Sequence, residues 1–184
     1  GVDIKAFSYD WKKRATKKLL FVGNFSYFPN KQAIMYFYHD VFKKIKDKDV
    51  SLKIIGANSS KLNIDDDRVT TSSYVVDIHK EYARADVFVF PLKIGGGSNF
   101  KVIEAMASGV PVIGFAQRLE GLSVVAGVHF VEAKDNASFI TGVENLLFDS
   151  ALASRISKNA REYIEKKYSW QIIGQKLEKI INDL

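Results

Sequence analysis

The sequence predicts an α/β fold: a doubly wound parallel sheet with helices on both faces. Two observations lead to this fold class. Short apolar runs typical of buried parallel strands alternate along the chain with longer amphipathic stretches typical of helices. The 184 residues, 47% apolar and 26% charged, have the length and composition of one ordinary globular domain with a sizeable core. We find no internal repeat, low-complexity tract or break in composition.

Five apolar runs are predicted to form the strands of this sheet. They are Leu19–Val22, Leu52–Gly56, Val87–Pro91, Val110–Phe115 and Val128–Val131. The segment Thr70–Val76 is predicted to add a weaker strand that leads into a loop. If the six strands take the common order 3-2-1-4-5-6, the order reverses between the first and the fourth. Ligands of such sheets bind at the carboxyl ends of those two strands.

Amphipathic periodicity predicts helices around these strands. One is predicted to begin at Pro29 and Asn30, and its apolar face carries Ala33, Ile34, Phe37, Val41 and Ile45. Asp135 is predicted to cap the next, and Leu152–Ile164 to form the third. A last helix, capped by Ser169, carries an apolar stripe of Trp170, Ile173, Leu177, Ile180 and Ile181.

Composition narrows the function classes. The net charge is +6, but much of the excess lies beside or within amphipathic segments, and no nucleic-acid-binding motif accompanies it. We interpret this charge as solvated helix faces and expect no nucleic-acid partner. The absence of cysteine excludes a disulfide scaffold, thiol catalysis and cysteine-ligated zinc, and fits a reducing compartment. The three histidines lie too far apart to indicate a local metal site.

The hydropathy and the first residues of the chain give three further expectations. No apolar run approaches the ~20 residues that a membrane-spanning helix needs. The first residues, Gly1–Trp11, contain no apolar segment typical of a signal peptide. The chain does not begin with Met, so we expect it to be a piece of a longer protein.

Glycines follow both strands that flank the predicted reversal. Gly23 comes after the first strand, and Gly95, Gly96 and Gly97 come after the fourth. Two glycine turns at one crevice indicate a binding site, although each could also be a simple turn or a flexible loop. The second run is not a dinucleotide-binding fingerprint, because Phe100 takes the place of the last glycine. Nor is it a Walker A loop, since no Gly-Lys-Ser/Thr closes it.

A helix is predicted directly after the triple glycine. Ser98 is its expected N-cap, Asn99–Ser108 its span, and Gly109 its end. The glycines would then place bare backbone N–H groups at a helix N-terminus. The helix dipole and these unpaired donors favour an anion there.

Lys101 and Glu104 are three residues apart and therefore share one face of this helix. The simplest interpretation is a surface ion pair that contributes about 0.2–0.5 kcal/mol. However, a lysine in the first turn opposes the helix dipole unless an anion is bound there. A carboxylate one turn further on is suited to accept hydrogen bonds from vicinal hydroxyls, as acidic residues do from ribose. The pattern indicates a site for a nucleotide or a nucleotide sugar.

These residues resemble a known family. The segment from Gly96 to Ile113 reads GGSNFKVIEAMASGVPVI and is similar to the donor-binding signature of glycosyltransferase family 4, the group 1 glycosyltransferases. Gly1–Phe7 resembles the segment that links the two halves of these enzymes, and Phe21–Asn30 their glycine loop. Individually weaker matches follow in the expected order at Tyr74–Asp77, Ala85–Pro91, Glu120–Leu122 and Tyr168–Trp170. The resemblance thus covers nearly the whole chain.

The resemblance implies a Rossmann-like domain that is the C-terminal half of a B-type glycosyltransferase fold. Residues 1–15 would be the remnant of the interdomain linker and its lead-in, and residues 16–184 the donor domain. The N-terminal acceptor domain, absent from this chain, would be its partner. The implied activity is retaining, metal-independent transfer of a sugar from a nucleotide sugar to an unidentified acceptor, in glycan biosynthesis, without a cofactor. The resemblance also implies a cytoplasmic location, with peripheral contact to the inner face of the membrane as an option.

The resemblance also assigns residues. Glu104 would hold the donor ribose, Lys101 and the loop at Gly23 the diphosphate, the loop Tyr74–Val76 the base, and Gly95–Asn99 the transferred sugar. No catalytic residue and no metal ligand is assigned. The predicted donor-binding residues are Gly23, Asn24, Tyr74, Val75, Gly95, Gly96, Gly97, Ser98, Asn99, Phe100, Lys101 and Glu104.

The chain departs from the family pattern at three positions. Gly96 stands where many members carry a second glutamate, eight residues before the position of Glu104. Asn24 stands where many have an arginine, and Lys31 only approximately matches a second diphosphate-binding lysine. A subgroup with a triple-glycine loop shares these features, so we interpret the chain as a variant.

Two other functions stay open from the sequence. One is a sugar-nucleotide epimerase of related architecture, and the other is a non-catalytic glycosyltransferase-like module that binds a partner. The presence of Glu104 disfavours the second. If the chain is the donor half of a glycosyltransferase, we expect these 184 residues alone to bind a donor without transferring its sugar.

Overall fold

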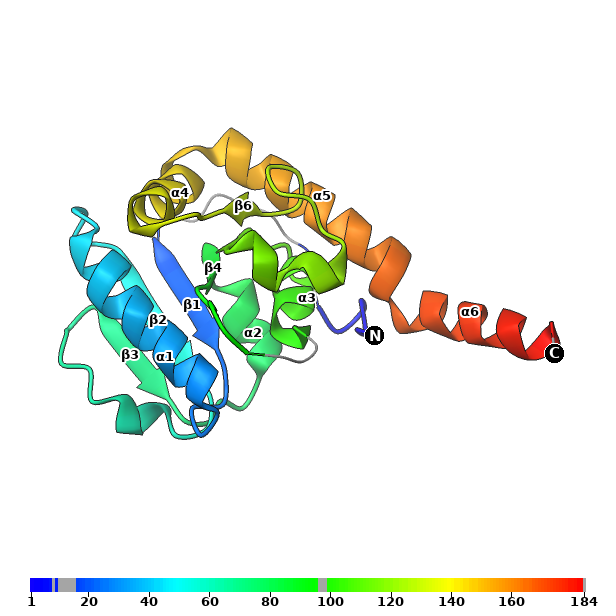
Figure 1. Ribbon diagram of the computed structural model, residues 1–184, viewed down its shortest axis with the longest axis horizontal. Helices are drawn as coiled ribbons and strands as arrows, with labels where there is room; N and C mark the ends of the chain where they lie inside the picture. Colours follow the sequence, from blue (N-terminus) through cyan, green and yellow to red (C-terminus); the bar gives the residue numbers. More distant parts are fainter. Residues whose placement is uncertain (8, 10–15, 96–98, 184) are drawn as a thin grey trace.

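The computed structural model describes residues 1–7, 9, 16–95 and 99–183. Its centre is a six-stranded sheet in the order β3-β2-β1-β4-β5-β6, with each adjacent pair parallel (Figure 1). The predicted strand order is confirmed, and it reverses between β1 and β4. The strands are β1 (Lys18–Val22), β2 (Ser51–Ile55), β3 (Val69–Ser72), β4 (Val87–Phe90), β5 (Val112–Gly114) and β6 (Val131–Glu132).

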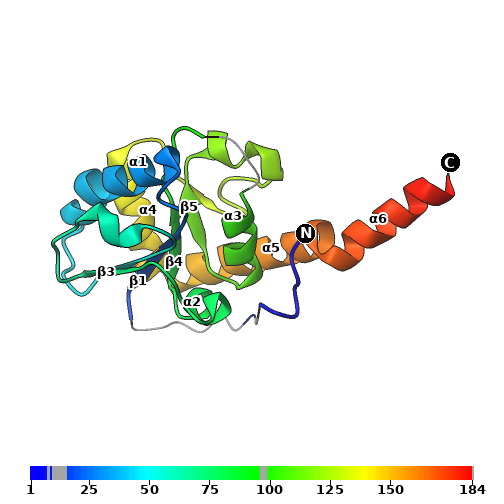
Figure 2. The same ribbon diagram turned by 90° about the horizontal axis from the view of Figure 1, so that it is seen from below.

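Helices cover both faces of the sheet (Figures 1 and 2). They are α1 (Phe28–Tyr36), α2 (Ile78–Ala83), α3 (Phe100–Ala107), α4 (Asn136–Phe148), α5 (Ser150–Tyr168) and α6 (Trp170–Asn182). α4 packs beside the continuation of α1 on one face, and α3 packs against α5 on the other. Because both faces are covered, all four residues of β4 are buried, as the continuous apolar run predicts.

The first predicted helix buries the expected apolar face, but it is not a regular α-helix along its whole length. All five residues of its predicted apolar face are buried. α1 gives way to a π-helical turn at Phe37–Val41 and then a 3-10 turn at Phe42–Lys44. Phe37, Val41 and Ile45 are four residues apart, which exceeds the 3.6-residue turn of an α-helix. The wider π turn keeps these side chains in line against the core.

Two predicted strands need correction. Val128–Val131 is not a strand, because the N–H groups of Val128 and His129 both bond to the carbonyl of Val125 and close a turn. Gly127, at φ +75°, makes that turn possible, and the strand begins only at Val131. The weak strand predicted at Thr70–Val76 ends at Ser72, and its remainder is the expected loop.

The predicted caps of the C-terminal helices are confirmed. The Asp135 carboxylate accepts from the N–H of Ser138 in a capping box, and Ser169 Oγ accepts from the N–H of Ile172. α6 extends away from the body of the domain (Figures 1 and 2). Its apolar stripe is therefore not part of the core: four members are 57–60% exposed, namely Trp170, Leu177, Ile180 and Ile181.

A close approach of two glycines fixes the start of the turn after β1. Gly56 follows β2 at φ +135°, and a Cβ there would lie 2.0 Å from the carbonyl oxygen of Gly23. The Gly23 N–H donates to the carbonyl of Ile55 at 2.9 Å. The two turns are therefore packed backbone to backbone, and any side chain at position 56 would separate them.

We predict that Gly56→Ala destabilises the fold by about 2–4 kcal/mol, through left-handed strain and overpacking. Chemical denaturation measures the change. Gly174→Ala is the control, since a Cβ in the middle of α6 meets nothing within 4 Å and removes a helix-disfavouring glycine. Equal stability of Gly56→Ala and the unchanged chain would show that the two turns are not packed in this way.

Candidate functional site

The turns after β1 and β4 meet at the carboxyl edge of the sheet. Gly95 follows β4 at φ +116°, and a Cβ there would lie 3.1 Å from Pro29 Cβ and 3.2 Å from Tyr27 Oη. Tyr27 and Pro29 belong to the turn after β1 and the start of α1. The structure thus brings the two predicted glycine turns together where the strand order reverses, which is where ligands of such sheets bind.

Lys101 joins α3 to the turn after β1. Its Nζ donates to Asn30 Oδ1 at 2.7 Å, and Asn30 Nδ2 donates to the carbonyl of Asn24 at 2.9 Å. The ammonium lies 5.3 Å and 5.8 Å from the ring centroids of Phe21 and Phe90. Burial among these groups lowers the pKa of Lys101 to about 8. A nearby anion would favour its charged form.

Glu104 lies one turn further along α3 and faces α2. Its Oε2 accepts a hydrogen bond from the hydroxyl of Tyr82 at 2.9 Å. Burial raises the pKa of Glu104, while the bond from Tyr82 and the charge of His79 lower it. The surface ion pair considered from the sequence is therefore wrong, because Lys101 and Glu104 are both partly buried and bind different partners.

The start of α3 differs by one residue from the prediction. α3 begins at Phe100 with Asn99 as its N-cap, and Gly96, Gly97 and the predicted cap Ser98 lie outside the described residues. Asn99 Nδ2 donates to the carbonyl of Arg118 at 2.6 Å, and the Arg118 guanidinium donates to the carbonyl of Gly95. The side chain of Asn99 makes no capping bond to α3. Its carbonyl accepts from the N–H groups of Val102 and Ile103, so only the amides ahead of these, at Phe100 and Lys101, are considered as donors to a ligand.

The other predicted site residues lie along the same edge of the sheet and differ in their contacts and exposure. Gly23 donates its N–H to Ile55, and Asn24 Oδ1 accepts from the N–H of Ser26 at 2.9 Å, so both hold the turn itself. Tyr74, two residues beyond β3, is 80% exposed, whereas Val75 packs partly against the core. Gly109 ends α3 at φ +71°, as predicted.

Sequence reasoning missed three residues of this site: Asn30, Tyr82 and Arg118. Asn30 reads as an ordinary helix opener after Pro29, yet it is only 6% exposed and bonds to Lys101. Tyr82 carries no signal in the sequence beyond its apolar spacing. Arg118 follows β5 at the ligand-binding edge, which is the one sequence feature that could have singled it out.

The described residues contain no group of three histidine, aspartate or glutamate side chains placed to hold a metal ion. Within the same part of the chain, no helix is both long and apolar enough to cross a membrane.

The model of the family described as group 1 glycosyl transferases matches residues 16–149. The chain belongs to this family. Among curated relatives, the capsular polysaccharide biosynthesis glycosyltransferase CapM of Staphylococcus aureus is 33% identical over 156 residues. That match covers 77% of this chain and 40% of CapM, so the chain spans less than half of this relative.

Solved structures of glycosyltransferases share the fold of this group 1 domain. Sucrose-phosphate synthase from Thermosynechococcus elongatus matches all of the chain with a TM-score of 0.79 at 21% identity, over 51% of its own length. Anabaena HepE in complex with UDP-glucose also matches all of the chain, with a TM-score of 0.79 at 14% identity, over 56% of its length. The C-terminal domain of LpcC from Francisella tularensis matches over its entire length and 92% of this chain, with a TM-score of 0.69 at 19% identity.

We predict that Lys101→Met makes the empty domain more stable at pH 7. The lysine pKa falls from 10.5 to about 8 on folding, so the cost of its charge is fully present below pH 8 and disappears as the pH rises through 10.5. Allowing for the donor that Asn30 loses, the expected gain is about 1–2 kcal/mol.

Urea denaturation of the unchanged chain and of Lys101→Met at pH 7 and pH 10 tests this prediction. The other titrating groups are the same in both proteins, so their effect on stability cancels in the difference. The stability difference should narrow at pH 10. Lys134→Met, at an exposed lysine, is the control and should change the stability by less than about 0.5 kcal/mol. A wild-type chain that is the more stable of the two at pH 7 contradicts the prediction.

Proposed function

We propose that this chain is the nucleotide-sugar-binding half of a retaining, metal-independent glycosyltransferase. The observation that supports this most is the pair of partly buried charged side chains on α3. Lys101 lies beside the helix start and the glycine turns, and Glu104 lies one turn further on. This spacing matches a diphosphate followed by a ribose diol.

The diphosphate is assigned to Lys101 and the start of α3. An ammonium group has three donors, and Asn30 uses one of them. The first amides of α3 add further donors and the positive end of the helix dipole. These groups supply positive charge where a leaving nucleoside diphosphate develops negative charge, which stabilises the transition state of sugar transfer. Transfer without a metal rests on this arrangement and on the resemblance.

The ribose is assigned to Glu104. Tyr82 takes one lone pair of Oε2, so the carboxylate retains acceptor sites for the two hydroxyls of a diol. The exposed ring of Tyr74 is assigned to the base, together with Val75. Gly95–Asn99 and Phe100 are assigned to the sugar side of the donor. Anabaena HepE, which shares the fold, has been solved in complex with UDP-glucose, a ligand of this kind.

A second domain is proposed to complete the enzyme. The N–H of Val2 bonds to the carbonyl of Tyr168, and the N–H of Trp170 bonds to the carbonyl of Val2, so the chain enters at the base of α6. The exposed apolar stripe of α6 starts at the same place. An acceptor domain preceding residue 1 would cover this stripe and close the site from water. We therefore expect these 184 residues to bind a donor but not to transfer its sugar.

Two further features complete the proposal. These are the retention of anomeric configuration and the cytoplasmic location with peripheral contact to the membrane. A role in glycan biosynthesis agrees with the relationship to CapM, a glycosyltransferase of capsular polysaccharide biosynthesis.

The proposed function predicts that the domain binds a nucleoside diphosphate without a divalent metal. Calorimetry with uridine, guanosine and adenosine diphosphates, each with and without a chelator, tests it. We expect at least one of them to bind with the same affinity in both conditions. Binding that requires the metal, or no binding to any of the three at millimolar concentration, would remove the basis of the proposal.

A second prediction concerns the ribose. Glu104→Gln loses charge-assisted hydrogen bonds of about 1.5–3 kcal/mol, which weakens binding about ten- to hundredfold. The unchanged protein should prefer a ribonucleotide to its 2′,3′-dideoxy analogue, and Glu104→Gln should lose most of this preference. Lys101→Ala should instead weaken the diphosphate relative to the monophosphate and keep the preference.

Glu178→Gln, at an exposed glutamate on α6, is the matched control for the loss of one negative charge. It should leave both the affinity and the preference unchanged. A folded Glu104→Gln protein with unchanged affinity and unchanged preference for the diol rules out the ribose role.

A further inference from the structure

The N-terminal segment Gly1–Phe7 reaches the ribose-assigned carboxylate through one intervening side chain. Phe7 is buried, and its ring lies edge-on to His79 and Tyr82, with centroid distances of 4.4 Å and 6.0 Å. Tyr82 in turn donates its hydroxyl to Glu104. A continuous chain of contacts therefore runs from the point where the chain enters the domain to Glu104.

Tyr82 is well placed to hold Glu104. Its side chain is fully buried, and its ring packs against Phe88 of β4 with the centroids 5.8 Å apart. The hydroxyl also lies 3.2 Å from the carbonyl of Lys101, so it is within reach of two acceptors on α3. A rigid ring with one hydroxyl aimed at a carboxylate restricts where that carboxylate can point.

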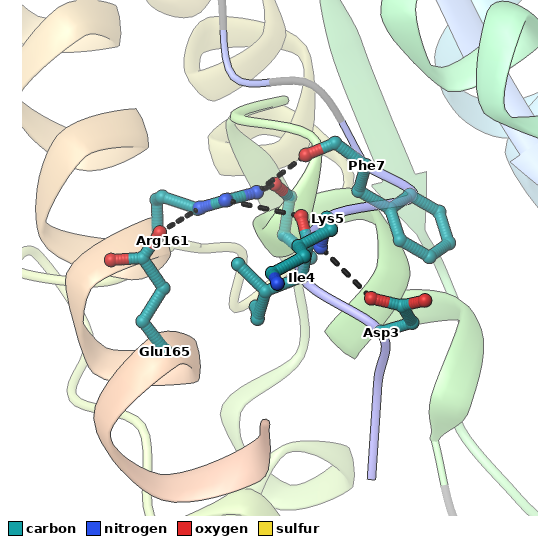
Figure 3. A network of polar contacts seen from close by, with 7 residues as sticks. Asp3, Ile4, Lys5, Phe7, Arg161 and Glu165 are labelled. Carbon is teal, nitrogen blue, oxygen red and sulfur yellow. Dashed lines mark hydrogen bonds and ion pairs between the residues drawn. The ribbon is translucent and has the colours of Figure 1, made fainter. Parts of the chain in front are cut away.

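The segment that carries Phe7 is itself fastened by one arginine (Figure 3). Arg161 of α5 donates from Nη1 to the carbonyl of Phe7 at 2.8 Å and from Nη2 to that of Ile4 at 3.3 Å. The same guanidinium bonds to the carbonyl of Ala107, the last residue of α3, and pairs through Nε with Glu165 at 2.6 Å. The segment and the end of α3 are thus held by the same group.

We propose that Tyr82 is a positioning residue for the donor site: it aims the Glu104 carboxylate at the ribose diol, and Phe7 braces Tyr82. The segment Gly1–Phe7 thereby influences the strength of ribose binding. This inference rests on the proposed function, because it requires Glu104 to bind a ribose. It adds a positioning role for Tyr82 and Phe7, neither of which would touch the nucleotide.

The titratable groups near Glu104 come from its own helix and from α2. Lys101 lies on its own helix, Tyr82 and His79 lie on α2, and Asp77 lies 3.4 Å from His79 Nδ1. The bond from Tyr82 lowers the pKa of Glu104, so its removal raises that pKa. Ribose binding by the ionised carboxylate would then be lost at a higher pH as the solution is acidified.

The test measures the affinity ratio of a nucleoside diphosphate to its 2′,3′-dideoxy analogue. The probe is uridine, guanosine or adenosine diphosphate, whichever binds tightest, and calorimetry is run from pH 5 to 8. Both ligands carry the same phosphates, so phosphate binding cancels in the affinity ratio. The unchanged chain and Tyr82→Phe both carry His79, so a difference in the ratio between them reports on the Tyr82 hydroxyl. We expect Tyr82→Phe to lower the ratio about three- to tenfold at pH 7 and to move its acid limb to higher pH.

Tyr163→Phe is the matched control. It removes a hydroxyl that bonds to the carbonyls of Leu122 and Ser123, away from Glu104. It should leave the ratio and its pH profile unchanged, even where it costs stability. A Tyr82→Phe protein with the ratio and the pH profile of the unchanged chain overturns the inference while the proposed function stands. An unchanged chain without any preference for the diol overturns both.

Phe7→Ala tests the brace and does not depend on the folding of the Tyr82 variant. It should lower the ratio, and an unchanged ratio overturns the role of Phe7. In a double-mutant cycle, Phe7→Ala should have little further effect when Tyr82 is already phenylalanine. Additive effects would show that Phe7 acts on the ribose site by another route, which also contradicts the proposed brace.

Discussion

The hydrogen bond from Lys101 to Asn30 joins the two halves of the sheet at the point where the strand order reverses. Asn30 is bonded in turn to the carbonyl of Asn24, so the turn after β1 and the helix after β4 form one unit. This unit encloses an ammonium group, and burial lowers the pKa of Lys101, which means that the empty fold carries the cost of keeping it charged. A charged group kept at such a cost is typical of a binding site.

α3 divides its contacts between the two sides of the site. Lys101 faces the turn after β1, whereas Glu104, three residues later, faces Tyr82 of α2. The diphosphate-assigned and ribose-assigned groups therefore depend on different neighbours, although they lie on one helix. The first group depends on the packing of the glycine turns. The second depends on Tyr82, whose ring lies against Phe7 of the N-terminal segment.

The parts of the fold that could be predicted from the sequence depend on local or periodic features. Continuous apolar runs indicated most of the strands, and Asp135 and Ser169 marked helix starts because their caps are made within three residues. The strand order was taken from the fold class, whose common order this sheet has. The partners of Lys101 and Glu104 lie 71 and 22 residues away along the chain, so no local pattern could reveal them. For the same reason, the spacing of Lys101 and Glu104 suggested an ion pair between them, whereas in the fold they bond to Asn30 and Tyr82.

A crystal structure of this chain with its tightest-binding nucleoside diphosphate tests the central claim most directly. We expect the diphosphate at Lys101 Nζ and the first amides of α3, with the ribose hydroxyls on the carboxylate of Glu104. A nucleotide bound instead in the hollow lined by Lys93, Arg118 and Lys134, or one whose ribose points away from Glu104, would contradict that claim.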